Sequence, residues 1–136
     1  MTDRRPRVLD ASALVELCQG NPDLLGRLDD IEGEYVFAVP TVAIAEAQAV
    51  MALTSTSWEV VIGRPQVSEL PLSALAAVDA GDIARARLLH HPVHTALIGP
   101  LMVGHVIREA KVMGGVVMTR VPEAYGAYDV SITVIE

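Results

Sequence analysis

Asp10 is the first residue in this sequence whose type and position could do chemistry. It directly follows the β-type residues 7–9 and precedes apolar residues at positions 14, 17 and 18, whose spacing predicts a helix. A carboxylate on a turn from strand to helix lies at the carboxyl end of the strand, where open α/β sheets bind ligands. The alternative is that Asp10 or Ser12 only caps the helix by accepting hydrogen bonds from its first N–H groups.

Glu46 is the second candidate. It lies in a predicted helix, and its i−4, i−3, i+3 and i+4 neighbours are all apolar: Val42, Ala43, Ala49 and Val50. A lone carboxylate on an apolar face is costly to bury unless it is paired, hydrogen-bonded or bound to a metal ion. The alternative is that Glu46 lies at the edge of the apolar stripe, where it reaches water or caps a neighbouring backbone.

Three clustered histidines, His90, His91 and His94, raise the hypothesis of a zinc site. No Cys or Glu completes a ligand set at the usual spacing, and Pro92 breaks the helix that an i, i+4 pair of ligands would need. The pattern therefore disfavours zinc.

His105 and Glu109 are spaced i, i+4 in a helix that is predicted to begin at Pro100. The apolar stripe of this helix consists of Val103, Val106, Ile107 and Ala110. Because His105 and Glu109 lie on the other side of the helix, we expect a surface pair.

The elements that must position these residues are five predicted strands separated by helices. The strands are expected at 7–9, 35–39, 66–70, 116–119 and 130–135, and the helices at 11–19, 22–30, 41–53, 56–63, 74–80 with 82–89, and 100–113, with a helical turn at 122–127. Crossover connections between successive strands predict an α/β fold, a three-layer α/β/α sandwich with a central parallel sheet. Neither a P-loop nor a G-x-G-x-x-G motif is present.

Composition narrows the class of protein. The 136 residues fit one domain (1–136), and 51% hydrophobic with only 4% aromatic residues indicates a core of Val, Ala, Leu and Ile. A net charge of −7 with a single lysine disfavours nonspecific electrostatic binding of nucleic acid. The lone Cys18 excludes an internal disulfide, and no export signal or membrane-spanning run is visible, so we expect a cytoplasmic protein. The high apolar content also predicts an exposed helical patch and a homodimer.

In the order and spacing of four segments, the sequence resembles the PIN domain of VapC-type toxins. The segments are VLDASAL (8–14), VP (39–40) followed by Glu46, AKVMGGVVMT (110–119) and PEAY (122–125). The resemblance implies a PIN-like fold whose carboxylates hold Mg²⁺ or Mn²⁺ and cleave RNA phosphodiesters. It also implies a tendency to dimerise and, for toxins, a small antitoxin partner.

The resemblance carries over only in part at the site. Asp10 matches the first acid of the family, Ser12 its frequent hydroxyl neighbour and Glu46 its second acid, so Asp10 and Glu46 are the expected catalytic and metal-binding residues. The positions of the two later acids hold Val103 and Val121. At most one ion is therefore expected, and two-metal clamping of the reacting oxygens is weakened or missing. If the alignment shifts by two residues, His105 becomes a substitute ligand.

Two hypotheses follow from this pattern. In the first, the protein is a metal-dependent endoribonuclease of the VapC toxin kind with attenuated activity. In the second, it is a catalytically inactive PIN-fold module that acts by binding or regulation.

Overall fold

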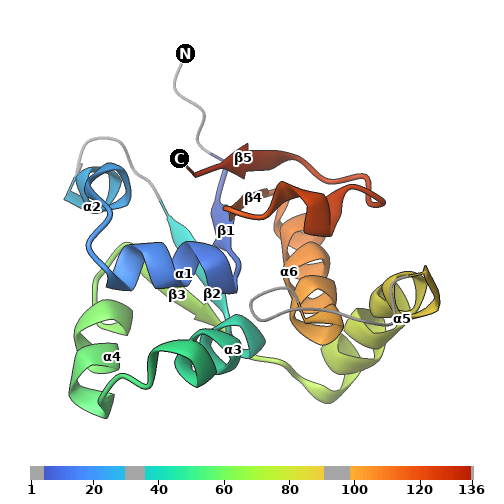
Figure 1. The fold of residues 1–136 in the computed structure, drawn as a ribbon, viewed down its shortest axis with the longest axis horizontal. Helices are drawn as coiled ribbons and strands as arrows, with labels where there is room; N and C mark the ends of the chain where they lie inside the picture. Colours follow the sequence, from blue (N-terminus) through green and yellow to red (C-terminus); the bar gives the residue numbers. More distant parts are fainter. Residues whose placement is uncertain (1–4, 30–35, 91–98, 136) are drawn as a thin grey trace.

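Five strands form one all-parallel sheet in the computed structural model, which describes residues 5–29, 36–90 and 99–135 (Figure 1). The strands are β1 (Arg7–Leu9), β2 (Phe37–Pro40), β3 (Val67–Leu70), β4 (Val116–Thr119) and β5 (Ile132–Val134). Their order in the sheet is β3-β2-β1-β4-β5. The predicted α/β class and the central parallel sheet are confirmed.

Within the described residues, six α-helices flank the sheet, and a short 3₁₀ helix follows β4. They are α1 (Ala11–Cys18), α2 (Pro22–Asp29), α3 (Thr41–Met51), α4 (Ser55–Ile62), α5 (Ala74–His90), α6 (Pro100–Met113) and the 3₁₀ helix η1 (Pro122–Tyr125). Helices α1 to α4 connect β1 to β2 and β2 to β3, whereas α5 and α6 return the chain from β3 to β4. No helix in the described ranges is long and apolar enough to cross a membrane.

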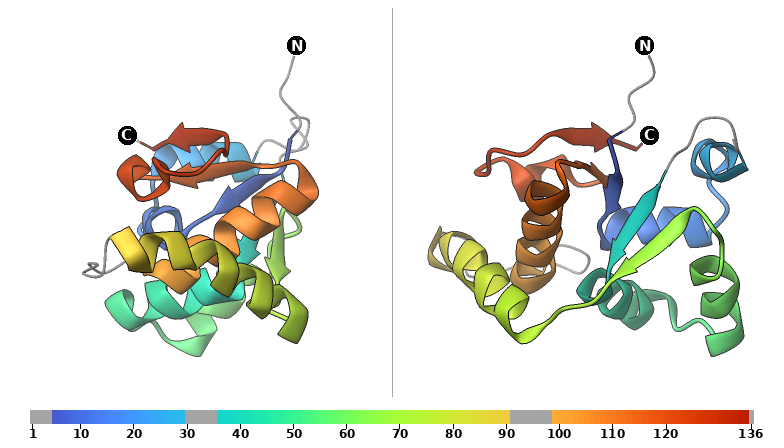
Figure 2. Two further views of the ribbon diagram at one scale, coloured as in Figure 1. Left: turned by 90° about the vertical axis from the view of Figure 1, so that its right-hand side faces the viewer. Right: turned by 180° about the vertical axis from the view of Figure 1, so that it is seen from behind.

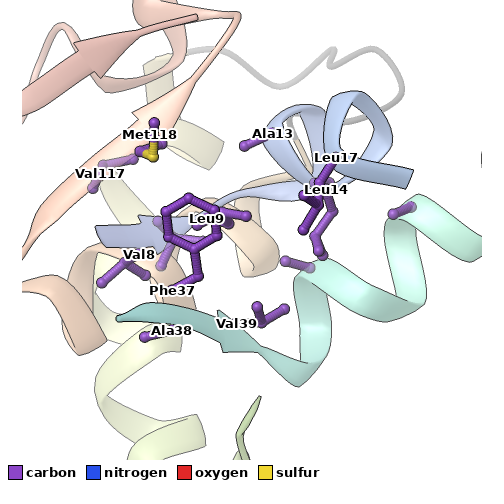
Figure 3. Close-up of a cluster of buried hydrophobic side chains, with 14 of the residues drawn as sticks. Val8, Leu9, Ala13, Leu14, Leu17, Phe37, Ala38, Val39, Val117 and Met118 are labelled. Atoms are coloured by element: carbon purple, nitrogen blue, oxygen red, sulfur yellow. The ribbon is translucent and has the colours of Figure 1, made fainter. Parts of the chain in front are cut away.

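The three central strands place the candidate site. Strands β1, β2 and β4 are buried along their whole length, and the edge strands β3 and β5 are partly exposed. Figure 3 shows apolar side chains of these central strands and of α1 gathered into one cluster. Because the register pairs Leu9 with Met118, the next residues, Asp10 and Thr119, lie at the same edge of the sheet.

Helix α6 lies between the sheet and α5 (Figures 1 and 2). Its predicted apolar stripe is fully buried. Helix α5 covers a second side, where a Cβ on Gly104 would lie only 2.3 Å from the carbonyl oxygen of Ala80. Glycine is needed here because any side chain would push the two helices apart.

This second contact corrects the expectation of a surface pair. His105 is 0% exposed and Glu109 is 7% exposed, so both are buried. The prediction was wrong because the periodicity of one helix shows its most apolar side but cannot show that another helix covers the opposite side.

Helix ends follow the predicted signals with one further correction. The side-chain oxygens of Asn21 and Ser73 accept hydrogen bonds from the backbone N–H groups of the first turns of α2 and α5. Helix α5 continues through Gly81 as one helix. Helix α4 begins at Ser55, one residue earlier than predicted, because the side chain of Thr54 accepts the capping hydrogen bond.

The histidine cluster is described only in part. His90 ends α5, whereas His91 and His94 lie outside the described residues.

Candidate functional site

Asp10 lies where the sequence places it, at the end of β1 and the start of α1. Its backbone N–H donates to the carbonyl oxygen of Met118 (3.3 Å), which extends the pairing of β1 with β4. Its Oδ1 accepts hydrogen bonds from the backbone N–H of Ala13 (2.9 Å) and the hydroxyl of Ser12 (2.6 Å). Asp10 is therefore the N-cap of α1 as well as the carboxylate at the strand end.

The second oxygen of Asp10 has a partner that sequence reasoning missed. Tyr125, on η1, is fully buried, and its hydroxyl donates to Asp10 Oδ2 (2.9 Å). The signal available in the sequence was general: a buried tyrosine needs a partner for its hydroxyl. Both carboxylate oxygens therefore accept hydrogen bonds from protein donors, and Asp10 is 0% exposed.

A small hydroxyl network joins α1 to the end of β4. The hydroxyl oxygens of Ser12 and Thr119 lie 3.2 Å apart, and Ser12 Oγ also accepts a hydrogen bond from the backbone N–H of Arg120 (2.9 Å). Thr119 Oγ1 accepts a hydrogen bond from the backbone N–H of Val121 (2.9 Å). The network fixes the chain immediately after β4 against the N-terminus of α1.

Burial and hydrogen bonding act in opposite directions on Asp10. Burial raises the pKa of the Asp10 carboxyl above its ordinary value, and hydrogen bonds from Ser12, Thr119, Ala13 and Tyr125 offset part of this rise. The hydrogen-bond donors thus offset part of the free-energy cost of burying the Asp10 carboxylate.

Glu46 has a different set of neighbours. It is partly buried on α3, and its Oε1 accepts a hydrogen bond from the backbone N–H of Gly99 (2.9 Å), the N-cap residue of α6. A Cβ on Gly99 would lie 2.7 Å from Glu46 Oε1, so only glycine allows this approach. The alternative noted for Glu46, capping of a neighbouring backbone, is the contact that forms. A negative charge is favourable at this position of a helix.

Glu46 also lines an apolar cleft of about 550 Å³. Its other lining residues are Val42, Ala45, Gly99, Pro100, Leu101 and Met102.

The two valines at the expected positions of the later acids differ in environment. Val103 is fully buried in the first turns of α6, and its backbone N–H donates to Gly99. Val121 is partly buried beside the hydroxyl network. Neither supplies an oxygen ligand from its side chain.

His105 lies apart from the Asp10 network in its contacts. Its Nε2 lies 3.4 Å from Glu109 Oε1, and neither ring nitrogen makes a hydrogen bond within the described residues. The side chain of Arg108 pairs with the same Glu109 oxygen (2.7 Å) and with Asp79 of α5. These contacts do not assign His105 the role of a substitute ligand.

The PIN-domain resemblance implies a divalent ion, and the donor set can be tested against it. Mg²⁺ needs oxygen ligands in near-octahedral geometry. Both oxygens of Asp10 and one of Glu46 already accept hydrogen bonds from the protein. Across the described ranges, no group of three or more His, Cys, Asp or Glu side chains is placed to hold a metal ion. This arrangement does not fit a metal centre, and metal binding by Asp10 and Glu46 stays a prediction.

The burial of His105 predicts a pH-dependent stability. Burial lowers the pKa of His105 below its ordinary value of 6.5, and Glu109 offsets this in part. The unfolded chain therefore takes up a proton first, so this residue lowers the free energy of unfolding as pH falls below 6.5. We expect His105→Gln to reduce the acid-side loss of stability, measured by urea unfolding between pH 7.5 and about 5. Identical pH profiles for the two proteins would contradict this.

Comparisons with known proteins give matches only at the level of structure. No protein-family model and no curated protein matches the sequence. The VapBC2 structure from Rickettsia felis, bound to a DNA fragment from its promoter, matches with TM-score 0.68 and 14% identity over 96% of this chain and 98% of that chain. The DNA-bound VapBC structure from Salmonella typhimurium matches with TM-score 0.66 and 16% identity over the same shares. A toxin–antitoxin complex from Klebsiella pneumoniae matches with TM-score 0.62 and 12% identity, again over 96% and 98%.

Both chains are covered almost completely in each comparison, so the likeness extends over the whole sheet and its helices. At these identities the likeness establishes the fold, and function must be argued from the site. The chain has the PIN-domain fold of the VapC toxins.

Proposed function

We propose that this chain is a VapC-type PIN-fold protein of the ribonuclease kind whose RNA cleavage is strongly attenuated. The proposal depends on the combination of a conserved fold with an altered site. The structural match to a toxin–antitoxin complex covers 96% of the chain. Asp10, however, is buried and accepts hydrogen bonds from protein donors. Val103 and Val121 occupy the positions where the resemblance implies acids. Without those acids, activation of a water molecule and stabilisation of the leaving oxygen are both weakened.

A small antitoxin-like protein is the proposed partner. The matched structures are VapBC complexes and a toxin–antitoxin complex, which supports a partner of this class. A short antitoxin-like reading frame directly upstream of the gene would support the pairing further.

We expect the purified protein to cleave single-stranded RNA slowly in the presence of Mn²⁺. A positioned general base contributes about 10²–10⁴-fold to a rate, so the loss of an acid should cost about that factor. The measurement is cleavage of a fluorogenic RNA, with Asp10→Asn as the matched control. Brisk cleavage that depends on Asp10 would contradict the proposed attenuation.

A catalytically inactive binding or regulatory module is the second candidate. It is favoured by the full hydrogen bonding of Asp10, which leaves neither carboxylate oxygen without a protein donor. The same assay separates the two candidates, because cleavage that does not exceed that of Asp10→Asn supports the module.

A homodimer is part of this proposal. Leu75 and Val78 on α5 are 79% and 60% exposed, and Leu72 just before the helix is exposed as well. Apolar residues grouped in this way are typical of an interface. We expect light scattering at micromolar concentration to give twice the chain mass of 14.5 kDa. A stable monomer under these conditions would count against the dimer.

A further inference from the structure

Tyr125, in the C-terminal part of the chain, donates a hydrogen bond from its hydroxyl to Asp10 (2.9 Å). The two residues are 115 positions apart, and both are 0% exposed. Tyr125 reaches Asp10 because η1 follows β4 directly, and the hydroxyl network of Ser12 and Thr119 holds that segment against α1.

This hydrogen bond is made to Oδ2 of Asp10, the oxygen that a cation would also need. Oδ1 already accepts two hydrogen bonds, from Ser12 and Ala13, so Oδ2 is the oxygen with more capacity for a ligand. The Tyr125 hydroxyl oxygen lies 2.9 Å from Oδ2. A divalent ion binds a carboxylate oxygen at about 2.0–2.6 Å, depending on the ion. The ion and its water ligands would therefore compete with the Tyr125 hydroxyl for the space beside Oδ2.

The other residues that the resemblance assigns to the site do not offset this loss for a cation. Val121 and Val103 have apolar side chains without oxygen atoms, and Glu46 accepts a hydrogen bond from the backbone N–H of Gly99. Binding of an ion at Asp10 would therefore break the hydrogen bond between Tyr125 and Asp10, and the ion would gain few oxygen ligands in return.

We propose that Tyr125 is a positioning residue whose hydroxyl occupies the position beside Asp10 Oδ2 where a divalent cation would bind. The Tyr125 hydroxyl and the cation therefore exclude each other at Asp10. Asp10 then acts as an internal acceptor that ties η1 to α1. This inference rests on the proposed function only in treating Asp10 as the position of the first site acid.

The test uses Mn²⁺ alone as the probe, with thermal unfolding as the readout and no RNA present. The variants are Tyr125→Phe, which removes the hydroxyl, and Tyr125→Leu, which also opens space beside the carboxylate. Tyr128→Phe is the matched control, because the Tyr128 hydroxyl donates to a backbone carbonyl, that of Ile83 (3.0 Å), away from Asp10. Circular dichroism checks that each variant is folded.

We expect Mn²⁺ to leave the melting temperature of the wild type and of Tyr128→Phe unchanged. At least one Tyr125 variant should gain a rise of a few degrees, and adding Asp10→Asn should abolish it. An Asp10-dependent rise in the wild type would overturn the proposal. Folded Tyr125 variants without any rise would overturn it as well, because the hydroxyl would then not be what excludes the ion.

If neither Tyr125 variant folds, the wild type still decides. No Mn²⁺ shift together with a Tyr125 hydroxyl proton that exchanges slowly with water in NMR spectra supports the exclusion. A Mn²⁺ shift or a rapidly exchanging hydroxyl proton contradicts it. Since the RNA assay is separate, failure of this inference is distinguishable from failure of the proposed function.

Discussion

Replacing Asp10 by alanine should lower the free energy of unfolding by about 3–5 kcal/mol, because the change removes the N-cap and leaves several buried donors without an acceptor. The donors are the backbone N–H of Ala13 and the hydroxyls of Ser12 and Tyr125. Asp10→Asn should cost about 1–3 kcal/mol, since it keeps one acceptor but turns an amide N–H₂ toward existing donors. Urea unfolding without metal measures both values.

This result separates two accounts of Asp10. If Asp10 and Glu46 were two uncompensated carboxylates awaiting a cation, removing one charge would relieve repulsion and stabilise the metal-free protein. An Asp10→Asn variant at least as stable as the wild type would therefore contradict the internal role that the hydrogen bonds indicate.

Restoring the two acids should have the second large effect. Val103 is 0% exposed, so Val103→Asp places an unpaired carboxylate in the core and should cost more than about 3 kcal/mol without metal. Val121→Asp should cost about 1 kcal/mol, because this position is only partly buried. In the double variant Mn²⁺ should recover part of the stability and raise RNA cleavage, and adding Asp10→Asn should remove the gain.

The control for these substitutions is Val112→Asp on the same helix. Val112 is 68% exposed, so its replacement should change stability little and leave Mn²⁺ binding unaltered. A folded double variant that binds Mn²⁺ no better than the wild type would show that the missing acids belong at other positions.

Local patterns in the sequence predicted the features that depend on neighbouring residues. The strand before Asp10, the helix that Asp10 caps and the apolar stripe of α6 each follow from local spacing, and the structure confirms them. The five parallel strands follow in the same way from alternating apolar runs and crossover helices.

The partners of the site residues could not be predicted, because they come from distant parts of the chain. Tyr125 meets Asp10 across 115 positions, and Gly99 meets Glu46 across 53. The burial of His105 likewise depends on how other parts of the chain pack around α6. Spacing within one helix contains no information about these contacts.

The central claim is that Asp10 is satisfied by the protein itself and does not form a metal centre in this PIN-fold chain. Calorimetric titration of the wild type with Mn²⁺ tests it most directly, with Asp10→Asn titrated in parallel. The account predicts no saturable binding in either protein, because slow residual cleavage needs only transient contact of Mn²⁺ with Asp10. Saturable binding near one ion per chain in the wild type, absent in Asp10→Asn, would contradict it.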